Sequence, residues 1–433
     1  MSARGRRSRN ALADITTTME QPDEHIKERV EALERFYVYR EPVDSPRQSS
    51  SRKRHADPAD FLREDTPNCS GDDEDYILRP DKVSFYRTPG IYKFRRRTST
   101  EPQIDYFAHY NLPDDCLLKI FSNFNKRDLV TAMKTCRRFY NIGESKDFWE
   151  AIDLSNKTVR LSDLLSIVAR GCKVLRMSGT NVLEDEFDPA GVEKCEYYGR
   201  PRLTHADFSR AIISSAALEW VLNGATKLQA IALENCEVTP TICRILHNNA
   251  NLQFLDLSMS RGLPECDLRF LSAFKRMHEL NLSWCALDVE NLHEVVSNIP
   301  TKLSRLSLAG QKDSLVDQHI ETLVQRCVNL MVLDLSESCD ISREAFTLLL
   351  RELQTLTTLS MARCFGVHPM AYLNCINIRQ LNIFGCVAEG GEEALRNRLP
   401  NTAINVTPYC DIARPTPPPS YTSIWGMRVK DLY

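Results

Sequence analysis

The stretch "LQFLDLSMS" at residues 252–260 is followed 25 residues later by "MHELNLSWC" at 277–285, with apolar residues at matching positions. Six further segments share this spacing, and they begin at residues 203, 228, 303, 330, 356 and 378. Successive segments start 22 to 27 residues apart, and each fits the pattern L-x-x-L-x-L-x-x-C/N. A pattern that recurs at this period predicts stacked copies of one small structural unit.

Each unit is a leucine-rich repeat. In the L-x-L triplet, both Leu side chains lie on the same face of a short strand. An amphipathic helix is predicted between successive strands, for example in "QHIETLVQRCVNL" at 318–330. A degenerate repeat at 172–180 and a truncated one at 403–409 give about ten repeats. The predicted fold class is α/β: a leucine-rich repeat solenoid, in which a curved parallel sheet is covered by outer helices.

The 15 cysteines fit the repeats rather than a metal or redox site. A small buried side chain is expected at the C/N position, and at the end of the preceding helix. No C-x-x-C pair occurs, so we expect no metal and no cofactor. The six cysteines at these two kinds of position are Cys236, Cys285, Cys364, Cys386, Cys327 and Cys375.

A second apolar pattern precedes the repeats, in "NLPDDCLLKIFSNFNKRDLVTAMKTCRRFYNIGESKDFWEAIDLS" at 111–155. Leu117, Ile120 and Phe121 recur at helical spacing, and Asp128 is predicted to cap a second helix that runs through Cys136 to Phe139. About 45 residues bury too little surface to be stable alone. The apolar stripe is therefore expected to pack against a partner or against the neighbouring solenoid.

This segment resembles an F-box, through its Leu-Pro start, Leu-Leu-x-x-Ile-Phe, Cys-Arg-Arg-Phe and final Phe-Trp. The repeats and the tail motifs "IARPT" and "IWG" extend the resemblance over about residues 107–428, to the S-phase kinase-associated group of F-box proteins. The resemblance implies a substrate receptor of an SCF ubiquitin ligase, bound to a Skp-type adaptor that links it to a cullin and a RING subunit. The matching adaptor-binding positions are Leu112, Pro113, Leu117, Ile120, Phe121, Leu129, Cys136, Phe139 and Trp149. Phe139 stands where the family more often has Trp, and Lys126-Arg127 replaces an apolar residue followed by proline.

The resemblance also implies that the concave repeat face binds a phosphorylated substrate, for which a Kip-type cell-cycle inhibitor is expected. Cations are scarce there, and Lys312 and Arg363 are the candidates for a phosphate, which suggests help from a Cks accessory protein. Trp284 is interpreted equally well as an interface anchor or as a residue packed along the repeat edge. The candidate binding residues are Trp284, Lys312, Asp334, Glu337, Arg363, Phe384 and Trp425. Asp256, Asn281 and Asn382 are also expected to be exposed on this face.

The tail at 408–433 contains a proline run at 415–419 that favours an extended chain. Tyr421, Ile424 and Trp425 are costly to leave in water, so we expect the tail to dock on the concave face. A disordered tail is the alternative.

Residues 1–105 are rich in proline, serine and charge, which predicts a disordered leader with a short helix near 23–40. The F-box is expected over 106–155, and the repeats over 156–407. Basic patches at 4–9 and 51–55 could serve nuclear import or be solvated charge runs, and we expect a protein of the nucleus and cytoplasm. Ser45-Pro46, Thr66-Pro67 and Thr88-Pro89 are candidate phosphorylation sites.

Composition excludes several functional classes. The net charge of −3 argues against nucleic-acid binding, and no apolar run is long enough to span a membrane. The first ten residues lack the apolar core of a secretory signal. No P-loop, G-x-S-x-G, H-E-x-x-H or dinucleotide motif occurs, so we expect a non-catalytic protein. The alternative to a ligase receptor is a leucine-rich scaffold or inhibitor with no link to ubiquitin.

Overall fold

The structure is a computed structural model, and it describes residues 112–184, 201–388, 390–416 and 422–429. The chain divides into two compact units, residues 1–39 with 114–433 and residues 40–113. All helices and strands named below belong to the first unit. The predictions for the leader, including the helix near 23–40, the basic patches and the three phosphorylation sites, fall outside the described residues.

Three short helices and one 3₁₀ turn form the region expected to be an F-box. The Phe121 ring lies at their centre, stacked on Phe124 at 5.1 Å between ring centroids and edge-on to Phe139 at 5.2 Å. Leu117 and Leu129 are also buried, so the apolar stripe holds the helices to one another. The elements are α5 (Asp114–Phe121), α6 (Lys126–Met133), α7 (Arg137–Gly143) and η2 (Lys146–Trp149).

The second predicted helix is wrong in two details. Asn125, not Asp128, is its N-cap, because the Asn125 side chain accepts a hydrogen bond from the backbone N–H of Asp128. The helix also ends at Met133, and a separate helix begins after Cys136. The apolar spacing continues across this break, which is why periodicity alone predicts one helix where there are two.

Trp149 joins the helices to the first repeat. Its indole is fully buried, and its Nε1 donates a hydrogen bond of 2.7 Å to the carbonyl of Gly143. The guanidinium of Arg170, at the end of the first repeat helix, lies 5.4 Å from the Trp149 ring and forms a 2.5 Å ion pair with Glu144. A buried ring with contacts on both sides fixes the helices to the repeats.

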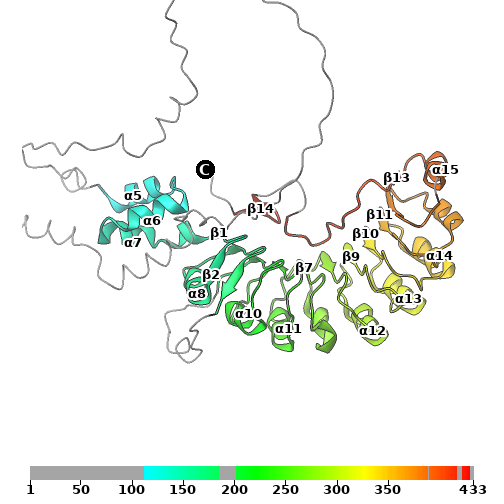
Figure 1. Cartoon of the computed structure of the whole chain (residues 1–433), viewed down its shortest axis with the longest axis horizontal. Coiled ribbons are helices and arrows are strands. Elements are labelled where there is room, and N and C mark those ends of the chain that lie inside the picture. Colours follow the sequence, from blue (N-terminus) through cyan, green and yellow to red (C-terminus); the bar gives the residue numbers. More distant parts are fainter. Residues whose placement is uncertain (1–111, 185–200, 389, 417–421, 430–433) are drawn as a thin grey trace, which may run out of the picture. The chain divides into compact units, whose positions relative to one another are not determined.

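The repeats form an eleven-stranded parallel sheet among the described residues (Figure 1). The middle residue of each three-residue strand, such as Leu255 or Leu333, points toward the helices and is at most 3% exposed. The strands are β1 (Ala151–Asp153), β3 (Val174–Arg176), β5 (His205–Asp207), β6 (Ala230–Ala232), β7 (Phe254–Asp256), β8 (Glu279–Asn281), β9 (Arg305–Ser307), β10 (Val332–Asp334), β11 (Thr358–Ser360), β12 (Gln380–Asn382) and β13 (Ala403–Ile404). A second, two-stranded parallel sheet pairs β2 (Thr158–Arg160) with β4 (Asn181–Leu183).

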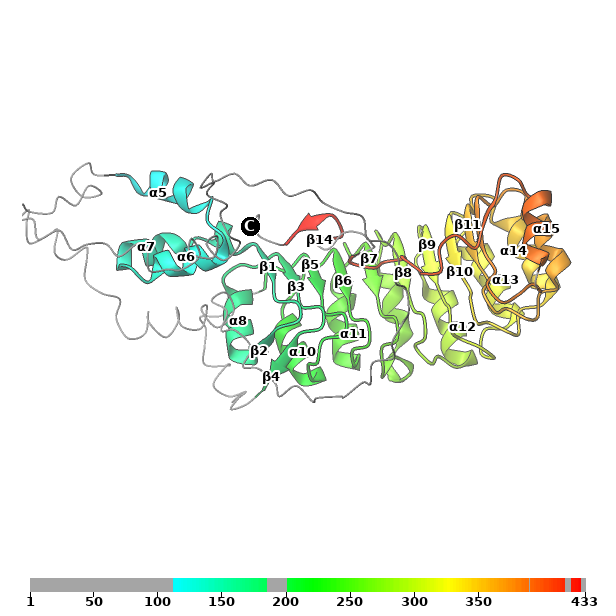
Figure 2. The ribbon, with the colours of Figure 1, turned by 45° about the horizontal axis from the view of Figure 1, so that its top comes forward.

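Helices cover one face of the sheet, which confirms the predicted fold class (Figures 1 and 2). Two repeats use 3₁₀ turns in place of an α-helix, and in both a proline stands at the start of a turn. The covering elements are α8 (Leu161–Ala169), α10 (Ser215–Leu222), α11 (Pro240–His247), η3 (Leu263–Glu265), η4 (Leu268–Ala273), α12 (Val289–Asn298), α13 (Asp317–Arg326), α14 (Arg343–Glu352), η5 (Pro369–Asn374) and α15 (Gly391–Arg398).

The first strand, β1, is one that the repeat pattern misses. "AIDLSN" at 151–156 has the spacing of a repeat strand and its polar turn residue, but it stands at the end of the F-box pattern. Its pairing with β3 adds an eleventh strand to the ten that were predicted. The F-box and the solenoid therefore share residues at their boundary.

The cysteines at the C/N position are buried or half-buried, and each thiol donates a hydrogen bond to a carbonyl of the preceding repeat. Burial raises the pKa of Cys236, Cys285 and Cys364 to about 12, so these thiols stay protonated. The sequence pattern finds these cysteines but does not reveal the hydrogen bonds. The bonds are Cys236 to Phe208 (3.2 Å), Cys285 to Leu257 (3.0 Å), Cys364 to Leu335 (3.2 Å) and Cys386 to Met361 (3.0 Å).

His319 is a buried neutral imidazole that supports two repeats. Its Nδ1 accepts from the backbone N–H of Val316, and its Nε2 lies 3.1 Å from the carbonyl of Val289. Burial lowers its pKa below the ordinary 6.5. The unfolded chain therefore binds a proton more readily, and stability is lost as the pH falls below about 6.5.

We expect the free energy of unfolding to fall by about 1 kcal/mol between pH 7.5 and pH 5.5 because of His319. Urea titrations of the wild type and of His319→Asn at both pH values measure this change in unfolding free energy. The His319 contribution to it is absent in the variant. His247→Asn is the matched control, since His247 is exposed. An equal pH dependence in His319→Asn and the wild type would contradict the assignment.

Candidate functional site: the strand face and its tail

The face of the sheet opposite the helices, here called the strand face, carries a row of polar residues. The third residue of each strand points to it, and the parallel register aligns these residues across the sheet. Most of them are buried, although they face away from the helices. The row consists of Asp153, Arg176, Asp207, Asp256, Asn281, Ser307, Asp334, Ser360 and Asn382, with Ala232 as its one apolar member.

The carboxylates in this row are unusually shielded from water. Asp207 is 1% exposed, and burial raises its pKa to about 6 although its Oδ1 accepts a hydrogen bond of 3.0 Å from the backbone N–H of Ser209. Burial also raises the pKa of Asp256, which is fully buried. Such charges are stable only beside a compensating cation.

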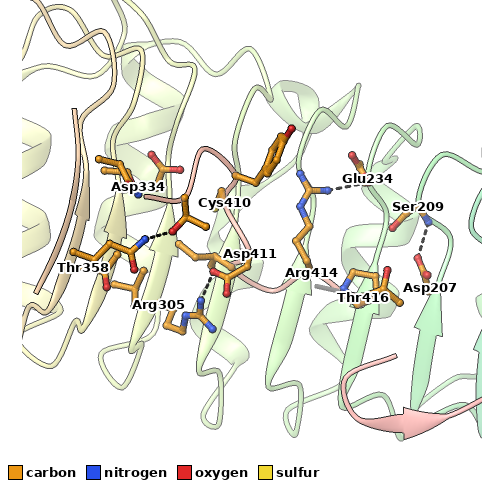
Figure 3. A pocket seen from close by; sticks show the side chains of 18 of the residues that line it. Asp207, Ser209, Glu234, Arg305, Asp334, Thr358, Cys410, Asp411, Arg414 and Thr416 are labelled. Carbon is orange, nitrogen blue, oxygen red and sulfur yellow. Dashed lines mark hydrogen bonds and ion pairs between the residues drawn. The ribbon is translucent and has the colours of Figure 1, made fainter. Parts of the chain in front are cut away.

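Arg176 of β3 lies 4.0 Å from Oδ2 of Asp207, and Arg414, in the C-terminal tail, supplies the cation for Asp256. The Arg414 Nη1 lies 2.8 Å from Oε2 of Glu234 and 3.3 Å from Oδ2 of Asp256. Further along the tail, Asp411 forms an ion pair with Arg305 of β9. Figure 3 shows both contacts, which hold the tail on the strand face by charge.

Backbone contacts add to these ion pairs. The N–H of Ala413 donates a 2.7 Å hydrogen bond to Oε2 of Glu279, and the side-chain amide of Asn281 donates to the carbonyl of Ile412 at 3.2 Å. Ile412 and Ala413 are both 1% exposed. Figure 2 shows the tail following the row of strands from β13 back toward β1.

The tail ends in a two-stranded hairpin of β14 (Ser423–Ile424) and β15 (Met427–Arg428). Ile424 packs with Val174 of the sheet. The Trp425 Nε1 donates to the carbonyl of Ala413 at 3.1 Å, and its backbone N–H donates to Pro415 at 2.8 Å. Trp425 therefore locks the hairpin against the rest of the tail.

A cavity of about 620 Å³ remains between the tail and the strand face. Asp207, Glu234 and Arg210 line it from the sheet, and Arg414 and Thr416 line it from the tail. Both the Asp207 Oδ2 and the Ser209 Oγ are buried there without a hydrogen-bond partner. The wall of the cavity near Thr416 is therefore acidic and incompletely paired.

Residues in the left-handed conformation form a second row, at the position that precedes the C/N site. Trp284 has φ of 60°, and the glycine at the same position of the next repeat, Gly310, has φ of 81°. A Cβ on Gly310 would lie 2.3 Å from Cδ2 of Trp284, so the indole extends across the glycine. The sequence offers a signal for this requirement, since Gly recurs at this repeat position, as Gly179, Gly310 and Gly385. The row consists of Asn156, Gly179, Arg210, Asn235, Met259, Trp284, Gly310, Glu337, Arg363 and Gly385.

This row brings together three of the residues expected to bind substrate. Trp284 is 43% exposed, and Arg363 forms an ion pair with Glu337 of the preceding repeat. Lys312 is exposed, and Phe384 is half-buried beside this row. The packing of Trp284 over Gly310 satisfies both interpretations of this residue, because the indole lies on the repeat edge and still faces solvent.

Asp334 does not lie on an exposed rim, as was expected. It is 7% exposed, accepts a 3.0 Å hydrogen bond from the N–H of Ser336, and lines the cavity under the tail. Asp256, Asn281 and Asn382 are likewise buried. The prediction fails because it counts every strand-face position as accessible, whereas the tail and the neighbouring polar side chains shield this row.

The residues matched to adaptor binding fall into three sets. Leu117, Phe121, Leu129 and Trp149 are at most 2% exposed, so their side chains hold the helices together. Ile120 is 45% exposed, and Pro113 is also exposed. Leu112, Cys136 and Phe139 are half-buried. An adaptor could reach only the second and third of these sets without unfolding the helices.

Within the described residues, no cluster of three or more His, Cys, Asp or Glu side chains could hold a metal ion. In the same part of the chain, no helix has both the length and the apolar composition needed to cross a membrane.

Comparison with known proteins matches two family models. Residues 109–155 match an F-box-like model, and residues 163–432, more than half of the chain, match the model of the SKP2 LRR domain. The junction at 155–163 lies just after β1.

Solved leucine-rich structures share low identity with the chain. An internalin (inlF) of Listeria monocytogenes is 12% identical, with 60% of this chain and 81% of that one covered and a TM-score of 0.35. An internalin C2 (inlC2) of the same organism is 14% identical, with 54% and 90% covered and a TM-score of 0.35. In the Rad7 and Elc1 complex of yeast, the matching chain is 16% identical, with 67% and 87% covered and a TM-score of 0.38.

The two family matches place an F-box directly before a leucine-rich domain of the SKP2 type. An F-box implies binding to a Skp1-type adaptor, and proteins with this pair of domains are typically non-catalytic substrate adaptors. The chain belongs to the SKP2-type family of F-box and leucine-rich-repeat proteins, the substrate receptors of SCF-type ubiquitin ligases.

Proposed function

We propose that this chain delivers a phosphorylated cell-cycle regulator, of the Kip-inhibitor type, to an SCF ubiquitin ligase for degradation. The F-box would bind a Skp-type adaptor, which links to the cullin and the RING subunit. The observation that carries this proposal is the coexistence of both domains in one chain, with Trp149 packed between them. Holding a substrate at a fixed distance from the transfer site is itself catalytic assistance, and it needs no catalytic residue in this chain.

Exposed apolar side chains at the first helix support the proposed adaptor-binding face. Ile120 is an apolar side chain on the first helix that remains 45% exposed while its neighbour Phe121 is buried. A solvated isoleucine on an otherwise closed helical unit is a natural contact for a partner. Pro113, just before the same helix, adds a second exposed apolar group.

Residues that the tail does not cover support the proposed substrate-binding face. The tail fills the strand face from Arg305 back to Val174, whereas Trp284, Lys312 and Arg363 remain solvent-exposed on the left-handed row and beside it. An aromatic anchor and two cations suit a phosphorylated peptide.

Arg363 is already paired with Glu337, so it is only partly available to a substrate phosphate. This supports the proposal that a Cks-type accessory protein also binds the phosphate. Lys312, two residues after Gly310 of the left-handed row, is an exposed cation that could contact the phosphate. We also propose that the receptor acts in the nucleus and cytoplasm, where fluorescence imaging of the tagged full-length chain would locate it.

We expect Ile120→Ala to weaken adaptor binding by roughly tenfold or more, the loss typical of a central interface residue. Replacement of Leu112-Pro113 by Ala-Ala should have at least this effect. Binding of the purified adaptor to the full chain, measured by calorimetry, gives the affinities. Val328→Ala is the matched control, because Val328 is also an exposed aliphatic residue, at 51%, but lies at the end of α13.

The proposal fails if Ile120→Ala and Val328→Ala bind the adaptor as tightly as the wild type, or if the wild type does not bind it. The second result would favour the scaffold or inhibitor alternative. Affinity purification from cells with the proteasome blocked tests the substrate side. Partners lost on Ile120→Ala are the adaptor and cullin, and phosphorylated partners retained are candidate substrates.

A further inference from the structure

The tail contains a phosphorylation motif placed against the acidic part of the strand face. Thr416 is followed by Pro417, and Thr416 lines the cavity together with Asp207 and Glu234 (Figure 3). It is half-buried, and it lies two residues after Arg414, whose guanidinium neutralises Glu234 and Asp256. A charge added at Thr416 would therefore act on the ion pairs that hold the tail.

We propose that Thr416 is the acceptor of a proline-directed protein kinase, and that its phosphorylation releases the tail from the strand face. In this step the Thr416 Oγ1 bonds to the γ-phosphorus of ATP and the bond to the bridging oxygen breaks. ADP leaves, and the hydroxyl proton passes to the kinase's base. The product adds a charge of about −1.5 to −2 beside carboxylates that already share their arginine partners.

The charges around Thr416 decide whether a phosphate there strengthens or weakens docking of the tail. Three cations line the same cavity, namely Arg210, Arg305 and Arg414. Arg414 is shared by two carboxylates, and Arg305 is paired with both Glu279 and Asp411. Both are therefore committed to charges already present.

Arg210 is the remaining cation. Its side chain is 71% exposed and lies 3.4 Å from Glu234. A phosphate at Thr416 would compete with Glu234 for a solvated guanidinium, while it also faces the buried Asp207, whose Oδ2 lies 4.0 Å from the Nε of Arg176, a cation already shared with Asp153. Repulsion from buried carboxylates is screened less than attraction to an exposed arginine, so the net effect is unfavourable to docking.

Thr416 directly follows Pro415, which links the docked tail to the hairpin, so a charge at Thr416 acts near both. Pro415 accepts the backbone hydrogen bond of Trp425, so displacement of 415–416 also breaks a contact that holds the hairpin against the rest of the tail. The kinase acts on the minor population in which the tail is lifted, and the phosphate prevents its return. Release would uncover Asp256 and the strand face as far as Val174.

The test uses the full chain with Thr407→Ala, which removes the other Thr-Pro site of the tail at 407–408. A purified proline-directed kinase and ATP are added, and mass spectrometry locates the phosphate. Hydrogen exchange then follows the amide of Ala413, which donates to Glu279 of the strand face, and the amides of Trp425 and Val429, which donate to Pro415 and Thr422 within the tail. We expect phosphorylation at Thr416 to speed their exchange by roughly tenfold or more, while the amides of β10 stay unchanged.

Two substitutions separate charge from size. Thr416→Glu should speed exchange of the same amides, and Thr416→Lys should slow it, because a cation there would pair with the acidic wall. Thr422→Glu is the matched control, as Thr422 is an exposed threonine of the same tail. The proposal is overturned if the kinase leaves Thr416 unmodified, if phosphorylation slows exchange or leaves it unchanged, or if Glu and Lys act in the same direction.

Discussion

Arg414→Met is expected to detach the tail and lower the free energy of unfolding by about 3 kcal/mol. The substitution keeps the length and apolar character of the stem but removes the charge that lies between Glu234 and Asp256. Asp256 is fully buried, so its carboxylate would then be left without a cation, or the tail must lift to let water reach it. Urea unfolding measures the loss, and hydrogen exchange at Ala413 and Trp425 shows whether the tail has lifted.

A rescue variant identifies the cause of that loss. Asp256→Asn removes the buried charge, so it should restore part of the stability in the Arg414→Met background although it weakens the wild type. Arg269→Met is the control for a solvated ion pair, since Arg269 and its partner Asp267 are 71% and 59% exposed, and it should change stability little. Additive effects of Arg414→Met and Asp256→Asn would show that the two side chains do not act as a pair.

Trp149→Ala is expected to cost about 3–5 kcal/mol and to uncouple the helices from the repeats. The indole is fully buried, and the change removes its hydrogen bond to Gly143 and its contact with Arg170. The repeats have their own core, so we expect the helical part to unfold at a lower temperature than the solenoid. Calorimetry should resolve two transitions where the wild type shows one.

Trp149→Phe separates the two contributions of this residue. The phenyl ring keeps most of the buried apolar area but leaves the Gly143 carbonyl without its donor, which costs about 1–3 kcal/mol. Trp220→Ala is the control for loss of an indole at a half-buried site on α10. If Trp149→Ala melted in a single transition at the wild-type temperature, the packing of the helices against the repeats would not depend on this side chain.

The repeats were predictable because their signal is local and recurs. A Leu or Ile stands at the middle of nearly every strand and Cys recurs at the turn in four repeats, so one weak copy is identified by its neighbours. The strand β1 was missed because it falls where two patterns meet, and the second helix was misjudged because its apolar spacing runs through the break after Met133. Asn125 and Asp128 are both good capping residues, and only the backbone geometry decides between them.

The candidate site was predictable in part. Trp284, Glu337 and Arg363 were placed on one surface by repeat position, and the structure brings them into one row of left-handed residues. Asp334 was misplaced because its exposure depends on side chains from other repeats and from the tail. Arg414 was not singled out at all, because nothing in the local sequence around it indicates which strands it will meet.

The sequence by itself determined the α/β solenoid and the helical segment before it, since both follow from short-range spacing of apolar residues, and the resemblance of its motifs to F-box proteins indicated the family. The tertiary structure decided which polar residues are accessible. Residues 414 and 234 are far apart in the chain, and only the path of the tail across the sheet brings the guanidinium to the buried carboxylates. Burial and charge compensation depend on the whole fold, and for that reason they cannot be read from any one segment.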